Sequence, residues 1–297
     1  MSGYRHIDGL AVTRHFLLGI GAALFLAPFL WMIGTSFKSR SEIFDASLNP
    51  FPAGDATLDN YRHVLLETPM PQFLVNGVVV CSGILVAQLA IAIPAAYALA
   101  KLKFPGQSWF FSLVLVGLAI PAFLPTLPLF VALHKVGLIG SQVGLLNTYA
   151  ALILPFSISV FGIFLFRQHF KAISDDTINA ARIDGMTEWS IAWRVVLPQA
   201  RPAVIAFAIF SIAGHWNDLL WPLIVVSQER QATPPLGMIY FLNETGVGAD
   251  YGPLTAAATF VTLPIVAVFL IAQRHMTDGL TLSGRAEDLN QLRNRKR

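Results

Sequence analysis

Residues 170–202 read FKAISDDTINAARIDGMTEWSIAWRVVLPQARP and form a polar stretch between two long apolar runs. Ser174 and the two acidic residues after it are typical of a helix N-terminus, where side-chain oxygens satisfy free amides and negative charge suits the helix dipole. Gly185 permits the sharp turn that would end this helix, and Thr187 can cap another one. The stretch therefore predicts a helix, a tight turn and a second helix.

The two predicted helices differ in their faces. The first has a small, alanine-lined face, whereas the second places Trp189, Trp193 and Val196 on one side at i, i+4 and i+7. Pro198 and Pro202 then close the segment and start the next apolar run. The stretch is too polar for membrane burial and holds no nucleophile or metal-ligand arrangement. We interpret it as a docking element for a partner protein.

The composition indicates the environment of the chain. Of its 297 residues 55% are hydrophobic and 12% are charged, with a mean hydropathy of +0.62. Soluble domains average about 25% charged residues, so we predict a membrane protein. The net charge of +3 needs no nucleic acid, because cytoplasmic loops of membrane proteins carry excess Lys and Arg. The single cysteine, Cys81, lies in an apolar run and is interpreted as a small buried hydrophobe.

Six apolar runs are long enough to be predicted spans, since crossing a bilayer takes about 20 residues. They lie at about 16–33, 73–99, 109–133, 145–166, 203–226 and 254–272. Each contains proline, which bends helices and frees a carbonyl, as suits spans around a transport path. The predicted fold class is all-α: a polytopic membrane protein with six transmembrane helices.

The distribution of positive charge predicts the orientation. With the N-terminus inside, fifteen of the 20 Lys and Arg residues lie on the inner side. Inner loops are the ones that carry excess Lys and Arg. We therefore expect both termini and residues 170–202 to face the cytoplasm.

The stretch resembles the EAA loop of ABC importer permeases, whose pattern runs roughly E-A-A-x-x-D-G-A and then Leu-Pro and a further Pro. The match here consists of Asn179, Ala180, Ala181, Asp184, Gly185 and Met186, followed by Leu197-Pro198 and Pro202. Asn179 replaces the family's Glu, so a neutral hydrogen bond would replace an ionic contact, and Met186 replaces its last Ala. The resemblance implies that these six residues couple the chain to an ATPase subunit.

Two further motifs extend the resemblance to the carbohydrate-type, maltose-type second permeases of this family. They are the run Ala95–Gly106 (AAYALAKLKFPG) and Trp216-Asn217-Asp218 with Trp221-Pro222-Leu223. The resemblance implies a type I importer permease in the bacterial inner membrane that moves a sugar, polyol or glycerol-phosphate-type solute inward. It also implies four kinds of partner: a homologous second permease, two ATPase subunits, an extracytoplasmic solute-binding protein and membrane lipid. ATP and Mg²⁺ would be bound by the ATPase, with no cofactor in this chain.

The same resemblance gives the domain organisation. It implies one transmembrane permease domain over residues 1–297, with a first span at about 14–34 and core spans within about 72–272. A cytoplasmic coupling loop would occupy 168–201 and a cytoplasmic tail 273–297.

Polar residues inside spans are costly and mark transport pathways by default. The candidates for the substrate pathway are His215, Trp216, Asn217, Asp218, Trp221, Gln88 and Asn76. Ser211, His215 and Asp218 would form one stripe at i, i+4 and i+7 of the fifth span. Asp218 could pair with His215 or cap a bent helix. Two readings stay open for these residues, a structural polar network and direct substrate contact. For the two tryptophans, interfacial anchoring and stacking on a sugar ring stay open. For Asn76 and Gln88, helix packing is favoured.

The outer segment 227–253 is predicted to be a loop, because it is rich in Gly and Pro. In the maltose-type family this loop reaches toward the binding protein, which implies that role for Tyr240, Asn243 and Glu244. A plain connector is the alternative.

Three absences bear on function. The sequence contains no GxxxxGK[ST] loop, so ATP hydrolysis is not expected in this chain. An intramembrane enzyme is disfavoured, because none of the seven histidines lies in an HExxH motif or accompanies a serine in a Gly-rich loop, and no metal site is predicted. A proton-coupled carrier is disfavoured, because we find no internal repeat and only Asp218 as an intramembrane acid.

Overall fold

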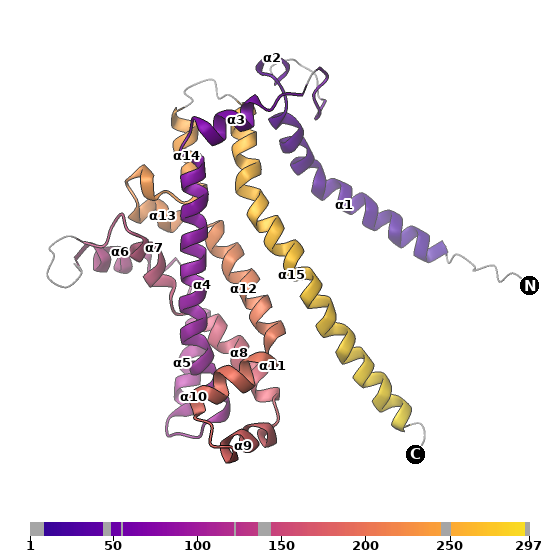
Figure 1. Ribbon diagram of the computed structural model, residues 1–297, viewed down its shortest axis with the longest axis vertical. Coiled ribbons are helices and arrows are strands. Elements are labelled where there is room, and N and C mark those ends of the chain that lie inside the picture. Colours follow the sequence, from indigo (N-terminus) through magenta and orange to yellow (C-terminus); the bar gives the residue numbers. More distant parts are fainter. Residues whose placement is uncertain are drawn as a thin grey trace, which may run out of the picture. The chain divides into compact units, whose positions relative to one another are not determined.

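Three of the six predicted spans are single long helices in the computed structural model. It describes residues 9–43, 49–54, 56–121, 123–135, 144–244 and 251–294, with side chains for 13–43, 49–54, 56–121, 123–134, 144–240, 242 and 251–273. The long helices are α1 (Gly9–Ser36), α4 (Met70–Lys101) and α15 (Tyr251–Asn294) (Figure 1). Each continues past one interior proline, Pro28, Pro94 or Pro264, and each carries an apolar segment long enough to cross a membrane.

The other predicted spans are broken. The fourth is divided into α7 (Tyr149–Ile153) with the 3₁₀ turn Leu154–Phe156, and α8 (Val160–Ala172), bent by 44°. The fifth is divided into α12 (Arg201–Trp216) and α13 (Leu220–Val225). The third is divided into α5 (Gln107–Ala119) and α6 (Thr126–Lys135), near Pro121 and Pro125, and α5 alone is too short to span. Two bent pairs of helices in the described residues are apolar and long enough to count as one span each, namely 149–172 and 188–216. With the three long helices they give up to five spans, so the number six stays a prediction.

The remaining described elements are short helices. They are α2 (Arg40–Ile43), α3 (Asp59–Leu66), α9 (Asp175–Ile183), α10 (Glu188–Ile191), α11 (Leu197–Gln199), α14 (Pro234–Glu244), a π-helical stretch (Ala192–Val196) and a 3₁₀ turn (Glu229–Gln231). The described residues contain helices, turns and one isolated bridge, and no strand. The all-α prediction is therefore confirmed.

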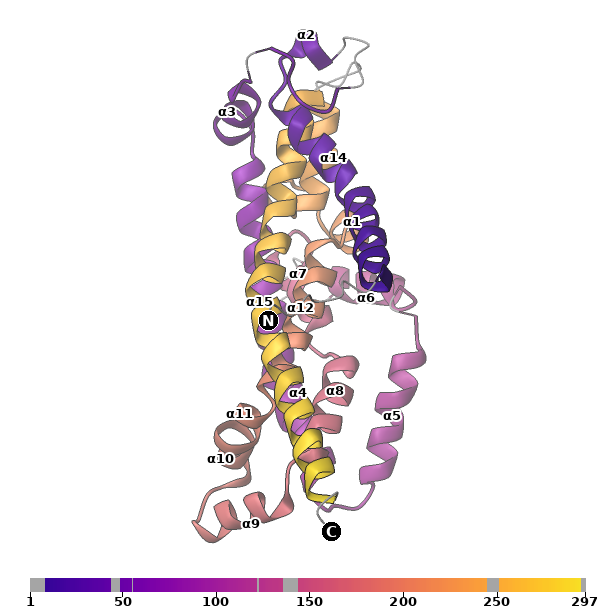
Figure 2. The same cartoon turned by 90° about the vertical axis from the view of Figure 1, so that its right-hand side faces the viewer.

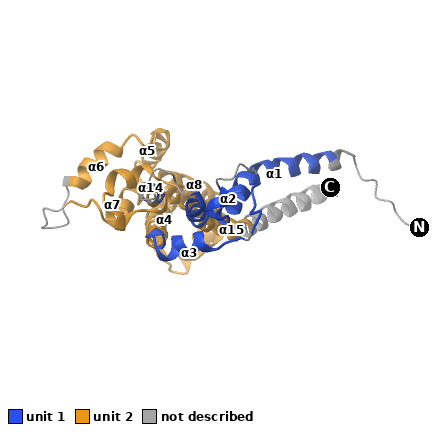
Figure 3. Cartoon of the chain, turned by 90° about the horizontal axis from the view of Figure 1, so that it is seen from above, with its two compact units in different colours: residues 1–71, 238–262 blue, residues 72–237, 263–297 orange. Residues whose placement is uncertain are grey.

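The chain consists of two compact units (Figure 3). Unit 1 comprises residues 1–71 and 238–262, and unit 2 comprises residues 72–237 and 263–297. In unit 1, Asn60 joins α3 to the end of α1, and Tyr61 joins α3 to α15. The Asn60 amide donates to the carbonyls of Ser36 and Lys38 at 2.9 Å, and the Tyr61 ring meets Phe260 edge-on at 5.5 Å.

In unit 2 the hydrophobic core gathers around the C-terminal half of α4. Ala92, Ala96 and Tyr97 of α4 pack with Phe166 and Phe170 of α8, which are fully buried. The same core includes Ile178 and Ala181 of α9, so it reaches into the predicted docking stretch. Helices α9 and α10 lie at the C-terminal end of α4 in two perpendicular views (Figures 1 and 2).

The predicted loop 227–253 is partly helical, and this corrects the sequence analysis. Helix α14 begins at Pro234, where the missing amide and fixed φ of proline suit the first helical position. The Gly237 amide donates to the Thr233 carbonyl at 2.7 Å and so closes the first turn. The prediction was wrong because Gly and Pro were read only as turn residues.

Candidate functional site

Residues 174–199, which we name the α9–α10 hairpin, adopt the predicted helix, turn and helix. The Ser174 hydroxyl accepts from the Asp176 amide at 3.2 Å, and the Thr187 hydroxyl accepts from the Ser190 amide at 3.3 Å. Both side chains thus cap their helices as predicted. The second helix runs through α10, the π-helical stretch and α11, and it meets α12 at 85°.

The turn between the two helices is a Schellman motif. Gly185 has φ of +79°, the Gly185 amide donates to the Arg182 carbonyl at 3.0 Å, and the Met186 amide donates to the Ala181 carbonyl at 3.1 Å. These two bonds satisfy carbonyls that a helix end leaves free. A Cβ added at Gly185 would meet nothing within 4 Å. The glycine is therefore required by the backbone angle and not by crowding.

The six residues of the EAA-like match divide into two groups. Asn179, Ala180, Asp184 and Gly185 are exposed. Ala181 is 6% exposed and lies in the core of unit 2, and Met186 packs against that core. Ala181 and Met186 therefore hold the hairpin against its own chain, whereas the resemblance placed them at a partner surface.

Two large apolar side chains on the hairpin are open to solvent. Ile183 is 87% exposed and Trp189 is 61% exposed. Together with Ala180 and Gly185 they make what we name the hairpin patch. Ile183 is absent from the sequence-based candidates, although its place immediately before Asp184-Gly185 is a signal that could have revealed it. The exposure of Ile183 and Trp189 on an otherwise polar element makes these two side chains candidates for contact with a partner.

Polar bonds tie the hairpin to one face of α4. The Tyr97 hydroxyl donates to the Glu188 carboxylate of α10, and Lys101, one turn further on, donates to Asp175 of α9 at 2.7 Å. Lys101 also donates to the Ile173 carbonyl at 2.5 Å. Residues at i and i+4 lie on the same helix face. Helix α4 thus holds both helices of the hairpin.

Arg182 completes this network. It donates to Glu188 at 2.7 Å and to the Asn179 amide oxygen at 3.1 Å. The bond from Arg182 lowers the pKa of Glu188 below its usual range, and the bond from Lys101 lowers the pKa of Asp175. Both carboxylates are therefore ionised at neutral pH. Asn179, at the position of the family's Glu, is thus bonded within the hairpin.

A second feature is a cavity of about 370 Å³ formed by α6, the Leu154–Phe156 turn, α12 and α13. Three of the seven pathway candidates line it, namely His215, Asp218 and Trp221. Phe156 lies 4.9 Å from the His215 ring and 5.9 Å from the Trp221 ring. The other lining residues are Phe123, Thr126, Leu129, Gly214 and Leu220. Aromatic walls with few polar groups are typical of small-molecule sites.

Gln88 lies behind this cavity and positions His215. Its carboxamide accepts from Ser211 at 2.6 Å, donates to the Phe156 carbonyl at 2.9 Å and lies 3.4 Å from the His215 ring. The predicted polar line of Ser211 and His215 is thus present. Asp218 does not belong to it, because α12 ends at Trp216, and its carboxylate instead accepts from the Trp221 amide at 3.3 Å. It therefore satisfies an amide in the first turn of α13, after the break that follows α12, and helix capping is one of the two roles expected for it.

The other pathway candidates lie elsewhere. Asn76 is buried and bonded to Gln72, Tyr149, Arg230 and Ala232, which agrees with helix packing. Asn217 is exposed and donates to the Ala213 carbonyl at 2.8 Å. Trp216 is 3% exposed and lines a separate apolar cavity of about 150 Å³. Trp221 is 5% exposed and donates to the Ala151 carbonyl at 2.9 Å.

Tyr240 is partly buried on α14. Asn243 and Glu244 end that helix, but their side chains lie outside the described residues, as do those of the predicted tail from residue 274 onward.

The sequence matches the family of binding-protein-dependent transport system inner membrane components over residues 88–281. The chain belongs to this family. The match covers the α9–α10 hairpin and all the cavity-lining residues. The chain is therefore a multi-pass transport permease and not an enzyme.

Similar proteins agree with this assignment. The permease is 35% identical over 275 residues to the arabinooligosaccharides transport system permease protein AraQ of Halalkalibacterium halodurans, covering 91% of this chain and 95% of that protein. It is 31% identical over 272 residues to the diacetylchitobiose uptake system permease protein NgcG of Streptomyces coelicolor, covering 91% and 87%.

A solved structure shows the shared fold. A chain of a bacterial ABC transporter involved in the import of the acidic polysaccharide alginate matches with a TM-score of 0.79 at 22% identity. The match covers 93% of the permease and 100% of that chain. The permease thus has the type I ABC importer fold.

Proposed function

We propose that this permease forms one half of the membrane channel of an ABC importer for sugars of the oligosaccharide class. A homologous permease would form the other half, two ATPase subunits would bind ATP and Mg²⁺, and an extracytoplasmic binding protein would deliver the solute. The names of two relatives specify arabinooligosaccharides and diacetylchitobiose, which supports this substrate class.

The observation that carries the proposal is the exposed hairpin patch on a hairpin that is itself bonded to α4. Large apolar side chains exposed on a polar element are candidates for burial in a partner, and we assign Ile183 and Trp189 to a groove of the ATPase. The excess of Lys and Arg at this end supports a cytoplasmic position for the hairpin and for both termini.

Two connections would carry movement from the hairpin to the cavity. Helix α12 starts directly after the hairpin at Arg201 and carries His215 fourteen residues later, about 21 Å along a helix that rises 1.5 Å per residue. Helix α4 is bonded to the hairpin by Tyr97 and Lys101 and carries Gln88, which touches the His215 ring. When ATP closes the ATPase dimer, displacement of the hairpin would move both helices and change access to the cavity.

Within the cavity, we propose that Trp221 and Phe156 stack against the faces of sugar rings. His215 and Thr126 would exchange hydrogen bonds with sugar hydroxyls. For Tyr240, Asn243 and Glu244 we propose contact with the binding protein, as the family resemblance implies.

The test is purification of the complex from its native membrane, followed by sugar uptake in proteoliposomes. We expect a separate ATPase subunit to copurify and uptake to require both ATP and the binding protein. Uptake driven by a proton gradient in the absence of ATP would overturn the proposal in favour of a secondary carrier.

A further inference from the structure

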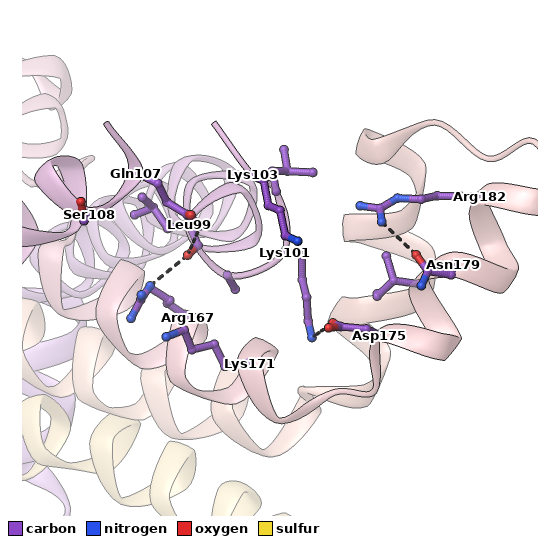
Figure 4. Close-up of a pocket in the computed structure, with 13 residues that line it drawn as sticks. Leu99, Lys101, Lys103, Gln107, Ser108, Arg167, Lys171, Asp175, Asn179 and Arg182 are labelled. Atoms are coloured by element: carbon purple, nitrogen blue, oxygen red, sulfur yellow. Dashed lines mark hydrogen bonds and ion pairs between the residues drawn. The ribbon is translucent and has the colours of Figure 1, made fainter. Parts of the chain in front are cut away.

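A second concave site lies at the end of α4, in unit 2, next to the α9–α10 hairpin and apart from the cavity beside His215 (Figure 4). It is a cleft of about 430 Å³ between the end of α4, the start of α5, α8 and α9. Five of its lining residues are cationic and only one, Asp175, is acidic. The cationic residues are Lys101, Lys103, Arg167, Lys171 and Arg182. We name this site the basic cleft.

Two of the five cations are neutralised by carboxylates. Lys101 is paired with Asp175 at 2.7 Å and Arg182 with Glu188 at 2.7 Å. Arg167 donates to the Leu99 carbonyl at 3.0 Å and lies 3.4 Å above the Phe111 ring, which fixes its guanidinium without neutralising it. Among the described residues, Lys103 and Lys171 have no carboxylate within 4 Å. The cleft therefore has three cations to offer an anion.

The cleft lies where the apolar part of the chain ends. Leu99, Ala100 and Leu102 form an apolar part of its lining. Ser108 of its rim is followed directly by Trp109 and Phe110, which are 60% and 49% exposed. Exposed aromatic rings next to basic residues are typical of the level of lipid headgroups. A ligand with an anionic head and an apolar body fits both parts of this lining.

We propose that the basic cleft binds the phosphate of an anionic phospholipid headgroup. Its place in the cytoplasmic leaflet rests on the proposed function, because the orientation does. Lys103, Lys171 and Arg167 would contact the phosphate, and the acyl chains would follow Leu99 and Leu102. Basic pockets between membrane helices are known to hold such headgroups. The Lys101–Asp175 pair belongs to both the cleft and the hairpin, so a bound lipid would also steady α9.

The test uses the intact complex in detergent, with native mass spectrometry to titrate phosphatidylglycerol or phosphatidylcholine. A Lys103→Gln and Lys171→Gln double variant removes two charges from the cleft. The control, Arg194→Gln with Arg201→Gln, removes two exposed charges outside it. We expect the double variant to bind phosphatidylglycerol about thirtyfold more weakly, at about 1 kcal/mol for each basic residue. The control should bind phosphatidylglycerol as the wild type does. Phosphatidylcholine should bind neither to the wild type nor to the control.

Three outcomes would overturn the proposal. Equal binding of both lipids would show that the basic cleft does not distinguish an anionic headgroup from a zwitterionic one. Displacement of phosphatidylglycerol by inorganic phosphate would show a site for the free ion. Loss of the ATPase subunit from the double variant, with lipid binding unchanged, would show that the cleft receives an acidic side chain of the partner. Lipid binding needs neither ATP nor solute, so the two proposals are tested separately. Absence of lipid binding with intact ATP-driven uptake would reject only the lipid site, and absence of uptake with intact lipid binding would reject only the proposed function.

Discussion

The α9–α10 hairpin and the cavity beside His215 belong to the same unit, but they are built in different ways. The hairpin is one run of consecutive residues whose caps, turn and exposed side chains all lie within residues 174–199. The cavity takes Thr126 from α6, Phe156 from a 3₁₀ turn, His215 from α12 and Trp221 from α13. The first is a product of local rules, whereas the second exists only after the helices pack.

The two regions also differ in what they expose. The hairpin leaves Ile183 and Trp189 largely open, although burying them would be favourable. The cavity keeps Trp221 buried and bonded. An element that docks on a partner must present apolar surface outward, whereas a solute site holds it in a fixed internal wall. Substitutions in the hairpin should therefore impair docking on the partner, whereas substitutions in the cavity should impair the affinity for the solute.

The largest effect is expected from Gly185→Asp. Aspartate, like asparagine, tolerates a φ of +79° better than most residues, so the main cost is the desolvation of a carboxylate at the docking surface. We expect uptake to fall by tenfold or more, at about 1.4 kcal/mol per factor of ten, with the protein still in the membrane. Uptake in whole cells with quantification of membrane protein checks this.

Gly185→Asn is the matched control for that variant. Asn is comparable in size and tolerates the left-handed region, but it is neutral. It should keep most of the uptake. Wild-type uptake and ATPase coupling in the Asp variant would show that the turn does not dock on a partner.

A comparison within α9 separates docking from packing. Ile183→Ala removes a side chain that is 87% exposed, so the stability of the permease should change by less than about 0.5 kcal/mol. Its affinity for the ATPase should fall by about tenfold, as for a buried interface anchor. Ile178→Ala removes a side chain that is 1% exposed and should destabilise the protein by about 2–5 kcal/mol. Thermal unfolding and ATPase pull-down measure the two effects, and equal results for both variants would contradict this division.

One of the bonds between α4 and the hairpin, from Tyr97 to Glu188, can be removed by deleting a single oxygen atom. Tyr97→Phe removes the hydroxyl that donates to Glu188 and keeps the buried ring. A hydrogen bond to a charged group contributes about 1.5–3 kcal/mol. We expect ATP hydrolysis to continue while the uptake per ATP falls severalfold. Proteoliposome assays of both rates give the ratio, and an unchanged ratio would show that the Tyr97–Glu188 bond is not needed for transmission.

Substitutions in the cavity should change the affinity for the substrate and not the docking of the hairpin on the ATPase. His215→Gln keeps a hydrogen-bonding group but loses the contact with the Phe156 ring, so we expect a KM for uptake that is several times higher. Asn217→Ala, on the exposed residue that follows α12, is the matched control and should change KM little. If the Asn217 variant has the larger effect, the solute path passes outside this cavity.

The smallest effect is expected from lowering the pH, which should change the stability of the hairpin. Arg182 lowers the pKa of Glu188, so the Glu188 carboxylate stabilises the folded hairpin at all pH values above its ordinary value of about 4.3. This stabilisation is lost as the pH falls through the lowered value. The protection factors of the hairpin amides, which are corrected for the intrinsic pH dependence of exchange, should therefore be constant from neutral pH to about pH 5. Glu188→Gln should reduce the change below that range, and the part that remains belongs to Asp175, whose pKa is lowered by Lys101.

Sequence reasoning succeeded where neighbours in the chain make the structure. The caps at Ser174 and Thr187, the turn at Gly185 and the three unbroken helices follow from local bonding and from hydropathy. It was wrong in placing Asp218 on the stripe of Ser211 and His215, because α12 stops at Trp216, and in reading residues 227–253 as a loop, because Pro234 starts a helix. In both cases the same residues permit a turn or a helix, and the packing around them decides.

The side-chain surroundings within the hairpin needed the structure. Ala180 and Ala181 are adjacent and identical, yet one is exposed and the other is buried against α4 and α8. The pairing of Tyr97 with Glu188 joins residues 91 positions apart, and no spacing rule predicts it. The same holds for the basic cleft, which combines Lys103 with Lys171.

The sequence by itself determined that this chain is a helical membrane permease with a capped hairpin between two apolar runs. Hydropathy, helix caps and the left-handed glycine act over a few residues, so they can be read directly. Only the tertiary structure decided which face of the hairpin is open, how α4 holds it and which side chains meet in the cavity and in the basic cleft. Those arrangements depend on contacts between distant helices, which form only when the packed core brings them together.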